Sequence, residues 1–169
     1  MREARSLLLV GRGYRAQQRP PQCDEAWTTL ACVNADPALI HLPNLKVWDC
    51  HEYENKYDVP VYDIRSDREK WMQHVHTHGQ VFANQYCWML ADLSTYPIQF
   101  RSVTLFGFLL NDEEHQNEIQ YLAYHIGYLR AAGVTVVIEQ PSQLLRPSVY
   151  GFTESLSEHV DKLGENVVE

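Results

Sequence analysis

Residues 103–139, VTLFGFLLNDEEHQNEIQYLAYHIGYLRAAGVTVVIE, decide the fold. The apolar run at 103–110 predicts a buried strand, and the run at 134–139 predicts another. Between them, apolar residues recur at spacings of three and four from Ile119 to Leu129, which predicts a helix that Gly133 ends. A strand, a helix and a strand in this order form a crossover unit. Its two strands lie parallel in one sheet, and its hand is nearly always right-handed.

The same alternation extends towards the N-terminus. Four further apolar runs predict strands, the last of them a short edge strand that tolerates a proline: 7–10, 27–33, 45–50 and 59–62. Residues 83–95 predict a helix with a face of small residues, whereas we expect the polar stretch 65–80 to be irregular. The sequence has no linker and no repeat. It therefore predicts a single α/β domain, a Rossmann-like, open and mostly parallel sheet flanked by helices.

The composition is that of a soluble globular domain. The chain has 169 residues, of which 45% are hydrophobic and 21% charged, so that a core of useful size can form. The longest apolar cluster, 103–110, is strand-sized and too short to cross a membrane, and 7–10 is too short for a signal peptide. We therefore expect a protein that is neither secreted nor bound to a membrane.

Charge and cysteine usage exclude further classes. The net charge of −8 disfavours nucleic acid as a partner. The charge is uneven, so we expect a basic N-terminal arm (1–6) and an acidic C-terminal tail (153–169) at the ends of one domain (1–169). The cysteines form no CxxC pair, which predicts reduced and mostly buried thiols rather than disulfides or a zinc site: Cys23, Cys32, Cys50 and Cys87.

Polar residues follow each predicted strand, and they are the candidate ligand-binding residues. In an open parallel sheet, ligands bind beyond the carboxyl ends of the strands, so we expect these residues to line a shared crevice. The alternative is that strand ends meet solvent in any case and polar loops follow for that reason. The residues are Gly11 and Gly13, Asn34 and Asp36, Asp49, His51 and Glu52, and Asn111 and Asp112.

The stretch Gly11-Arg12-Gly13 lies beside further arginines, among them Arg15. Backbone N–H groups in a glycine turn, together with guanidinium groups, suit a phosphate or a carboxylate. It lacks the third glycine of the dinucleotide fingerprint and is not a P-loop. A tight turn beside a basic surface that contacts a partner explains the same residues.

The histidines give weaker signals. On an extended strand, His74, His76 and His78 would share a side and could ligate zinc, but an exposed polar loop is the better interpretation, so we expect no metal. We expect His125 to lie on the polar side of its helix, in solvent. The tyrosines at 121, 124 and 128 are most simply helix packing, and the acidic residues at 112–114 favour a helix N-terminus without any catalytic role.

At this level of detail the chain resembles small proteins of tailed bacteriophages. The resemblance covers most of 7–152, and its most specific part is 115–152. The segments that carry it are LLLVGRG, ACVNA, VWDCHEYE with the following VPVY, VTLFGFLLNDEE, HQNEIQYLAYHIGYLRAAG and VTVVIEQPSQLLRPSVYGF. The layout is also distantly similar to Rossmann-like sialyltransferases and motility accessory proteins. Their loop usually carries small hydroxyl residues where this chain has Gly-Arg-Gly-Tyr-Arg.

The resemblance implies binding of a nucleotide or a nucleotide sugar, with Gly11, Gly13 and Asn34 near its phosphate and base. It implies the host cytoplasm or the virion as the location. No separate cofactor is expected.

Three functions remain open. In a glycosyltransferase-like enzyme, His51 or Asp49 would be the candidate base, and Arg12 and Arg15 would hold a diphosphate. A non-catalytic phage protein would keep the fold and bind a protein partner or form a homo-oligomer in a virion. The third possibility is a protein that sequesters a nucleotide signal without turning it over.

Overall fold

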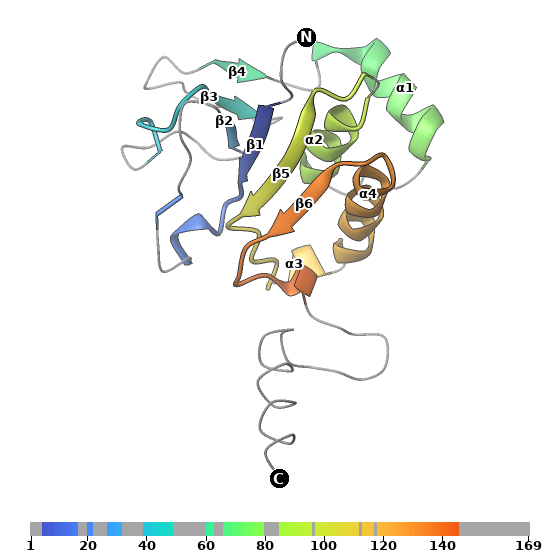
Figure 1. Ribbon diagram of the computed structural model, residues 1–169. Helices are drawn as coiled ribbons and strands as arrows, with labels where there is room; N and C mark the ends of the chain where they lie inside the picture. Colours follow the sequence, from blue (N-terminus) through green and yellow to red (C-terminus); the bar gives the residue numbers. More distant parts are fainter. Residues whose placement is uncertain are drawn as a thin grey trace.

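A computed structural model of the protein describes residues 5–16, 20–21, 27–31, 39–48, 60–62, 66–79, 85–95, 97–111, 113–116 and 118–145. Six strands form one sheet (Figure 1) in the order β4-β3-β2-β1-β5-β6, and each neighbouring pair is parallel. The strands are β1 Arg5–Val10, β2 Trp27–Ala31, β3 Leu45–Trp48, β4 Val61–Tyr62, β5 Phe100–Phe106 and β6 Thr135–Ile138. The helices are η1 Tyr14–Ala16, α1 Arg68–His78, α2 Gln85–Leu93, α3 Glu113–Gln116, α4 Ile119–Ala131 and η3 Gln143–Leu145.

The strand order contains one reversal. From β1 the chain builds outward through β2, β3 and β4, and then returns to the other side of β1 to place β5 and β6. The strands β1 and β5 are therefore neighbours, with Leu7 opposite Val103 and Val10 opposite Phe106. This arrangement confirms the predicted fold class, an open parallel α/β sheet of Rossmann-like type.

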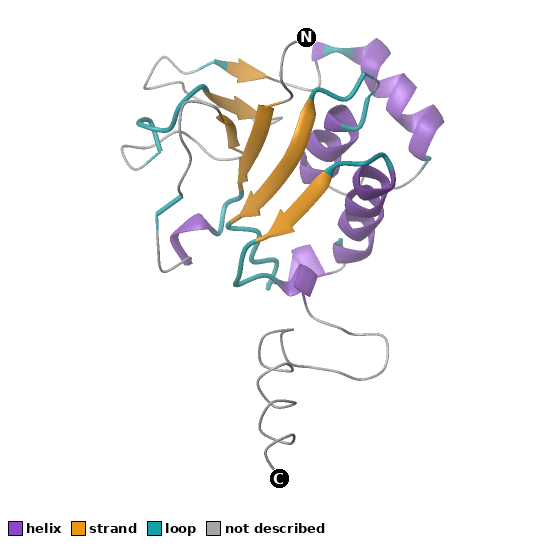
Figure 2. Ribbon diagram, in the orientation of Figure 1, coloured by secondary structure: helices purple, strands orange, loops and turns teal. Residues whose placement is uncertain are grey.

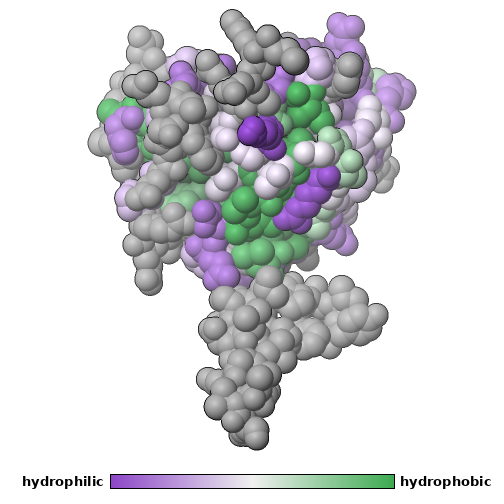
Figure 3. All heavy atoms as spheres, in the orientation of Figure 1, coloured by the Kyte–Doolittle hydropathy of each residue, from purple (hydrophilic) through white to green (hydrophobic). Residues whose placement is uncertain are grey.

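The two faces of the sheet are covered differently. Alternate residues of a strand point to opposite faces, and Leu7 and Leu9 point towards α2 and α4, where they are fully buried. Leu8 and Val10 point to the other face and pack with a second cluster that includes Tyr14 and Phe106. Figure 2 shows the longer helices α1, α2 and α4 gathered on one side of the sheet. In Figure 3 apolar atoms gather over β1, β5 and β6 on the opposite face.

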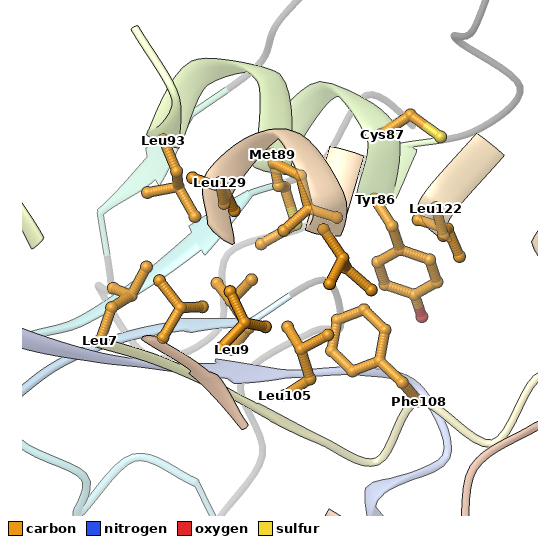
Figure 4. Packing of buried hydrophobic residues seen from close by; sticks show 14 of the residues in the cluster. Leu7, Leu9, Tyr86, Cys87, Met89, Leu93, Leu105, Phe108, Leu122 and Leu129 are labelled. Atoms are coloured by element: carbon orange, nitrogen blue, oxygen red, sulfur yellow. The ribbon is translucent and has the colours of Figure 1, made fainter. Parts of the chain in front are cut away.

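The main core lies between the sheet and helices α2 and α4 (Figure 4). Leu9 and Leu105 extend from the sheet into this core. Met89 on α2 and Leu129 on α4 extend into it from the helices, and all four side chains are fully buried. Burial of a leucine or methionine side chain contributes about 2 kcal/mol. This contact explains why Ile119 to Leu129 shows the apolar spacing from which the helix was predicted. Cys87, the cysteine in the described part of the chain, is buried and forms no disulfide, as predicted.

The expectation that 65–80 is irregular is wrong, because α1 occupies most of it. The helix begins where the Asp67 side chain accepts a hydrogen bond from the backbone N–H of Lys70 at 3.0 Å. It ends at Gly79, whose φ of 69° and N–H bond to the carbonyl of Val75 close the last turn. The buried face of α1 carries His74 and His78, which a search for apolar residues does not count.

Two boundaries in the crossover unit also differ from the prediction. The strand predicted at 103–110 begins earlier, at Phe100, and ends at Phe106, because Gly107 has a φ of 80° and turns the chain out of the sheet. The apolar residues Phe108 and Leu110 are buried in a loop rather than in a strand. The helical region consists of α3 and α4 rather than one helix starting near Asn111. Among the described residues, no helix is both long and apolar enough to cross a membrane.

Candidate functional site

A crevice of about 330 Å³ opens at the carboxyl ends of β1 and β5. It lies where the strand order reverses, which is the position at which open α/β sheets bind ligands. The loop after β1 forms one side, the loop after β5 forms the other, and the first turn of α2 contributes a tyrosine. The described residues that line it are Arg12, Gly13, Tyr86, Gly107, Phe108, Leu109, Leu110 and Asn111.

Glycines allow the two loops to interlock beside the crevice. A Cβ atom on Gly11 or on Gly13 would lie 2.8 Å from the carbonyl oxygen of Gly107. A Cβ atom on Gly107 would lie 2.5 Å from the backbone of Tyr14, and the φ of 80° at Gly107 also disfavours any other residue. The glycines of the Gly-Arg-Gly stretch are therefore required by close backbone packing, whether or not a ligand binds.

The backbone N–H groups of this loop donate to acceptors within the protein. Gly11 donates to the carbonyl of Phe106 at 2.7 Å, and Gly13 donates to the carbonyl of Gly107 at 2.9 Å. Arg12 donates to the hydroxyl of Tyr86 at 3.0 Å, which ties the loop to α2. Tyr14 donates to the carbonyl of Gly11 at 3.2 Å. These bonds hold the loop in place, and they leave side chains to recognise a ligand.

The floor of the crevice is apolar and aromatic. The rings of Tyr86 and Phe108 have centroids 4.6 Å apart at an angle of 49°, and both side chains are buried. Leu110 is also buried, with a φ of 55° that is unfavourable for leucine and costs on the order of 1 kcal/mol. The strained backbone turns the chain after β5 back along the crevice. Gln143 supports this turn, because its N–H donates to the carbonyl of Leu109 at 3.1 Å.

The polar groups lie at the rim. The side chains of Arg12 and Asn111 are exposed, and both residues line the crevice. In the described part of the chain, the Arg12 guanidinium makes no ion pair. Arg15 is placed differently: its Nε donates to the Tyr14 hydroxyl at 3.1 Å, and its guanidinium lies 5.6 Å from the centre of that ring. Arg15 is not among the described residues that line the crevice.

The structure thus brings together part of the predicted site. Arg12, Gly13 and Asn111 meet at the crevice, and Gly11 lies in the interlocked turn beneath it. Several candidate residues lie outside the described residues: Asn34, Asp36, Asp49, His51, Glu52 and Asp112.

Sequence reasoning missed Tyr86, Phe108 and Leu110. Tyr86 is 74 residues from its partner Arg12, and a single sequence gives no signal for that contact. Phe108 and Leu110 were assigned to a strand, so that their position in the crevice loop was not foreseen.

A second group of polar and aromatic side chains lies where α1 crosses α2. Asp92 accepts a hydrogen bond from Nε2 of His74 and forms an ion pair with the Nζ atom of Lys70 at 3.1 Å. The rings of Trp71 and Trp88 stack above it, with centroids 6.2 Å apart. The space among these residues is too small for a water molecule. This group therefore fastens one helix to another and offers a ligand no room.

Next to it is the histidine cluster, which we define as His74, His78 and His125. Nδ1 of His78 lies 3.0 Å from the Tyr124 hydroxyl, and the ring of His78 lies 5.1 Å from that of His125 and 4.9 Å from that of Tyr128. Burial, together with the neighbouring His125 and His74, lowers the pKa of His78 from 6.5 to about 4. His125 is only 1% exposed, so the expectation that it lies in solvent is wrong.

The extended arrangement that would let the HVHTH stretch ligate zinc does not occur. On a helix, His76 points away from His74 and His78, and it is exposed. Within the ranges that the structure describes, no group of three or more histidine, cysteine or acidic residues is placed to hold a metal ion.

The fold and the crevice together define a class: an open parallel α/β protein with a cavity at the reversal of its strand order. Comparison of the chain with protein-family models, with curated proteins and with solved structures finds no match. The function is therefore argued from the crevice itself.

Proposed function

We propose that this protein binds a small ligand with an anionic group and a flat or apolar body in the crevice between β1 and β5, and that the ligand is of the nucleotide class. The observation that carries the proposal is the meeting of Arg12, Asn111 and the aromatic floor at the reversal of the strand order. The volume of about 330 Å³ lies at the lower end of the range for small-molecule sites, which is about 300 to 1,000 Å³.

Each part of the crevice suits a part of such a ligand. The Arg12 guanidinium can form two parallel hydrogen bonds with a phosphate group. The Asn111 side chain supplies both a donor and an acceptor at the rim. Tyr86 and Phe108 line the crevice and form an apolar floor on which the body of the ligand can lie.

Binding without turnover is the form of this function that we favour. The loop N–H groups that could stabilise charge in a transferase donate to protein acceptors instead. This favours a protein that retains the fold and holds or sequesters a nucleotide, the non-catalytic alternative that the resemblance to phage proteins left open. A glycosyltransferase-like activity would need Asp49 or His51 at the crevice, and both lie outside the described residues.

The test is a thermal-shift and calorimetric panel of nucleotides and nucleotide sugars, run with a variant that fills the crevice. Asn111→Trp places an indole at the rim and should abolish the stabilisation, because the ring occupies the space for the ligand. Gln120→Trp adds the same ring at an exposed position on α4 and should leave it unchanged. No shift for any compound at millimolar concentration, or equal shifts in the two variants, would refute the proposal.

Turnover is tested on the compounds that bind. Product formation from a bound nucleotide sugar, followed by chromatography, would favour the transferase. Its absence at saturating ligand would support sequestration.

A further inference from the structure

We infer that the crevice recognises a single anionic group through the side chain of Arg12, and not a pyrophosphate through the glycine turn. The inference rests on the proposed function, and it specifies how the ligand is held: a nucleotide bound through one phosphate group, so that a second phosphate adds little affinity. Three observations carry it, namely the fixed N–H groups of the turn, the different positions of two arginines, and the size of the crevice.

The first observation concerns the backbone. A glycine turn that holds a pyrophosphate must direct several N–H groups at the ligand. Here the N–H groups of residues 11–14 point at acceptors in the protein, at 2.7, 3.0, 2.9 and 3.2 Å in sequence order. Turning any of them towards a ligand would break a hydrogen bond, and turning that of Gly11 or Gly13 would also separate the interlocked loops. The acceptors include the carbonyls of Phe106 and Gly107, which lie on the far side of the same interlock.

The second observation concerns the charges. Arg12 and Arg15 are three residues apart and both are exposed, yet only Arg12 lines the crevice. The guanidinium of Arg15 lies against the ring of Tyr14, whose side chain packs on the opposite face of the sheet. The described wall of the crevice therefore has one cation. A single guanidinium matches one phosphate or carboxylate in a two-bond geometry.

The third observation concerns space. Phe108, Leu109 and Leu110 line the crevice with apolar side chains, which suit a ligand with an apolar or flat body. A volume of about 330 Å³ suits one compact ligand, and a second phosphate at the open rim would remain in contact with solvent. Charge in solvent gains little binding energy. A second phosphate should therefore add little affinity.

The experiment measures binding of matched pairs of ligands by isothermal titration calorimetry: the 5′-monophosphate and the 5′-diphosphate of each common nucleoside. We expect the diphosphate to bind less than about tenfold more tightly than the monophosphate, since the second group meets no further cation among the described residues that line the crevice. Arg12→Gln should lower the affinity for the monophosphate by about tenfold or more. Arg15→Gln, the matched control in the same loop, should change the affinity for the monophosphate by less than about threefold. Arg12→Gln keeps the backbone N–H that donates to Tyr86.

Two results would overturn the inference while leaving the proposed function intact. One is a diphosphate that binds more than about tenfold more tightly than its monophosphate. The other is equal weakening by Arg12→Gln and Arg15→Gln. If no nucleotide of either kind binds, the proposed function fails together with the inference.

Discussion

The crevice and the group of residues where α1 crosses α2 both combine aromatic and polar side chains, and they differ in what those side chains leave open. At the crevice, two loops interlock beneath a space of about 330 Å³, and a cation stays exposed at the rim. At the crossing of α1 with α2, Lys70, His74 and Asp92 satisfy one another and leave no room for a water molecule. Ionisable residues gathered in one place therefore do not define a site, because a ligand also needs space and a polar group that can turn to it.

The same contrast separates the glycines of the two regions. Gly107, under the crevice, has a positive φ and touches the backbone of Tyr14. Gly79, at the end of α1, has a positive φ of 69° with open space around it. Gly127 lies inside α4, also in open space. Substitutions at these positions should thus have different effects.

The largest effect is expected for Gly107→Ala. The new methyl group would lie 2.5 Å from the backbone of Tyr14 and would force the two loops apart. Together with the unfavourable φ, this should lower the free energy of unfolding by about 3 kcal/mol or more, measured by urea denaturation. Gly79→Ala meets only the unfavourable φ and should cost about 1 kcal/mol. Equal losses in the two variants would contradict the interlock.

An intermediate effect is expected from acid at the histidine cluster. His78 has a pKa of about 4 in the folded protein, below the ordinary histidine value of 6.5 that applies to the unfolded chain, so the unfolded chain binds a proton first as the pH falls. The contribution of His78 to the free energy of unfolding should be fully present above pH 6.5 and should be lost as the pH falls from 6.5 to about 4. Among the described residues, the rings that face His78 are those of Tyr124, Tyr128 and His125 on α4 and of His74 on its own helix. None of them offers a carboxylate to a protonated imidazole.

The measurement is urea denaturation at a series of pH values, compared with His78→Phe, which keeps a ring and cannot titrate. The wild type should lose on the order of 2 kcal/mol relative to this variant between pH 7 and pH 4. His76→Gln removes an exposed histidine from the same helix and should follow the wild type. If His78→Phe shows the same acid profile as the wild type, the cluster does not limit acid stability.

The sequence predicted the sheet well and the site in part, and particular residues explain the difference. The crossover unit was readable because Ile119 to Leu129 place an apolar face on the core, and the strands were readable as continuous apolar runs. Helix α1 was missed because histidines form its buried face, and their burial depends on partners in α2 and α4. The rule that ligands bind at strand ends found Arg12, Gly13 and Asn111. It could not find Tyr86, because only the folded chain brings α2 to the glycine turn.

The sequence also could not predict which acceptors the N–H groups of the glycine turn bond to. The same Gly-Arg-Gly residues fit a turn that cradles a phosphate and a turn that interlocks with a neighbouring loop. Only the distances from Gly11 and Gly13 to Gly107 distinguish the two. These distances show that the turn packs against protein groups, so the expected backbone cradle for a phosphate does not form.

The smallest effect is expected for Gly127→Ala, a glycine that close packing does not require. A Cβ atom at this position meets nothing within 4 Å, and the residue is exposed in the middle of α4. Alanine is favoured over glycine inside a helix, so the variant should be more stable than the wild type by about 0.5 to 1 kcal/mol. Urea denaturation measures this gain, and the affinity for any crevice ligand should stay the same because residue 127 does not line the crevice. A loss of stability would mean that α4 carries a contact at this position, and the separation between required and replaceable glycines would then fail.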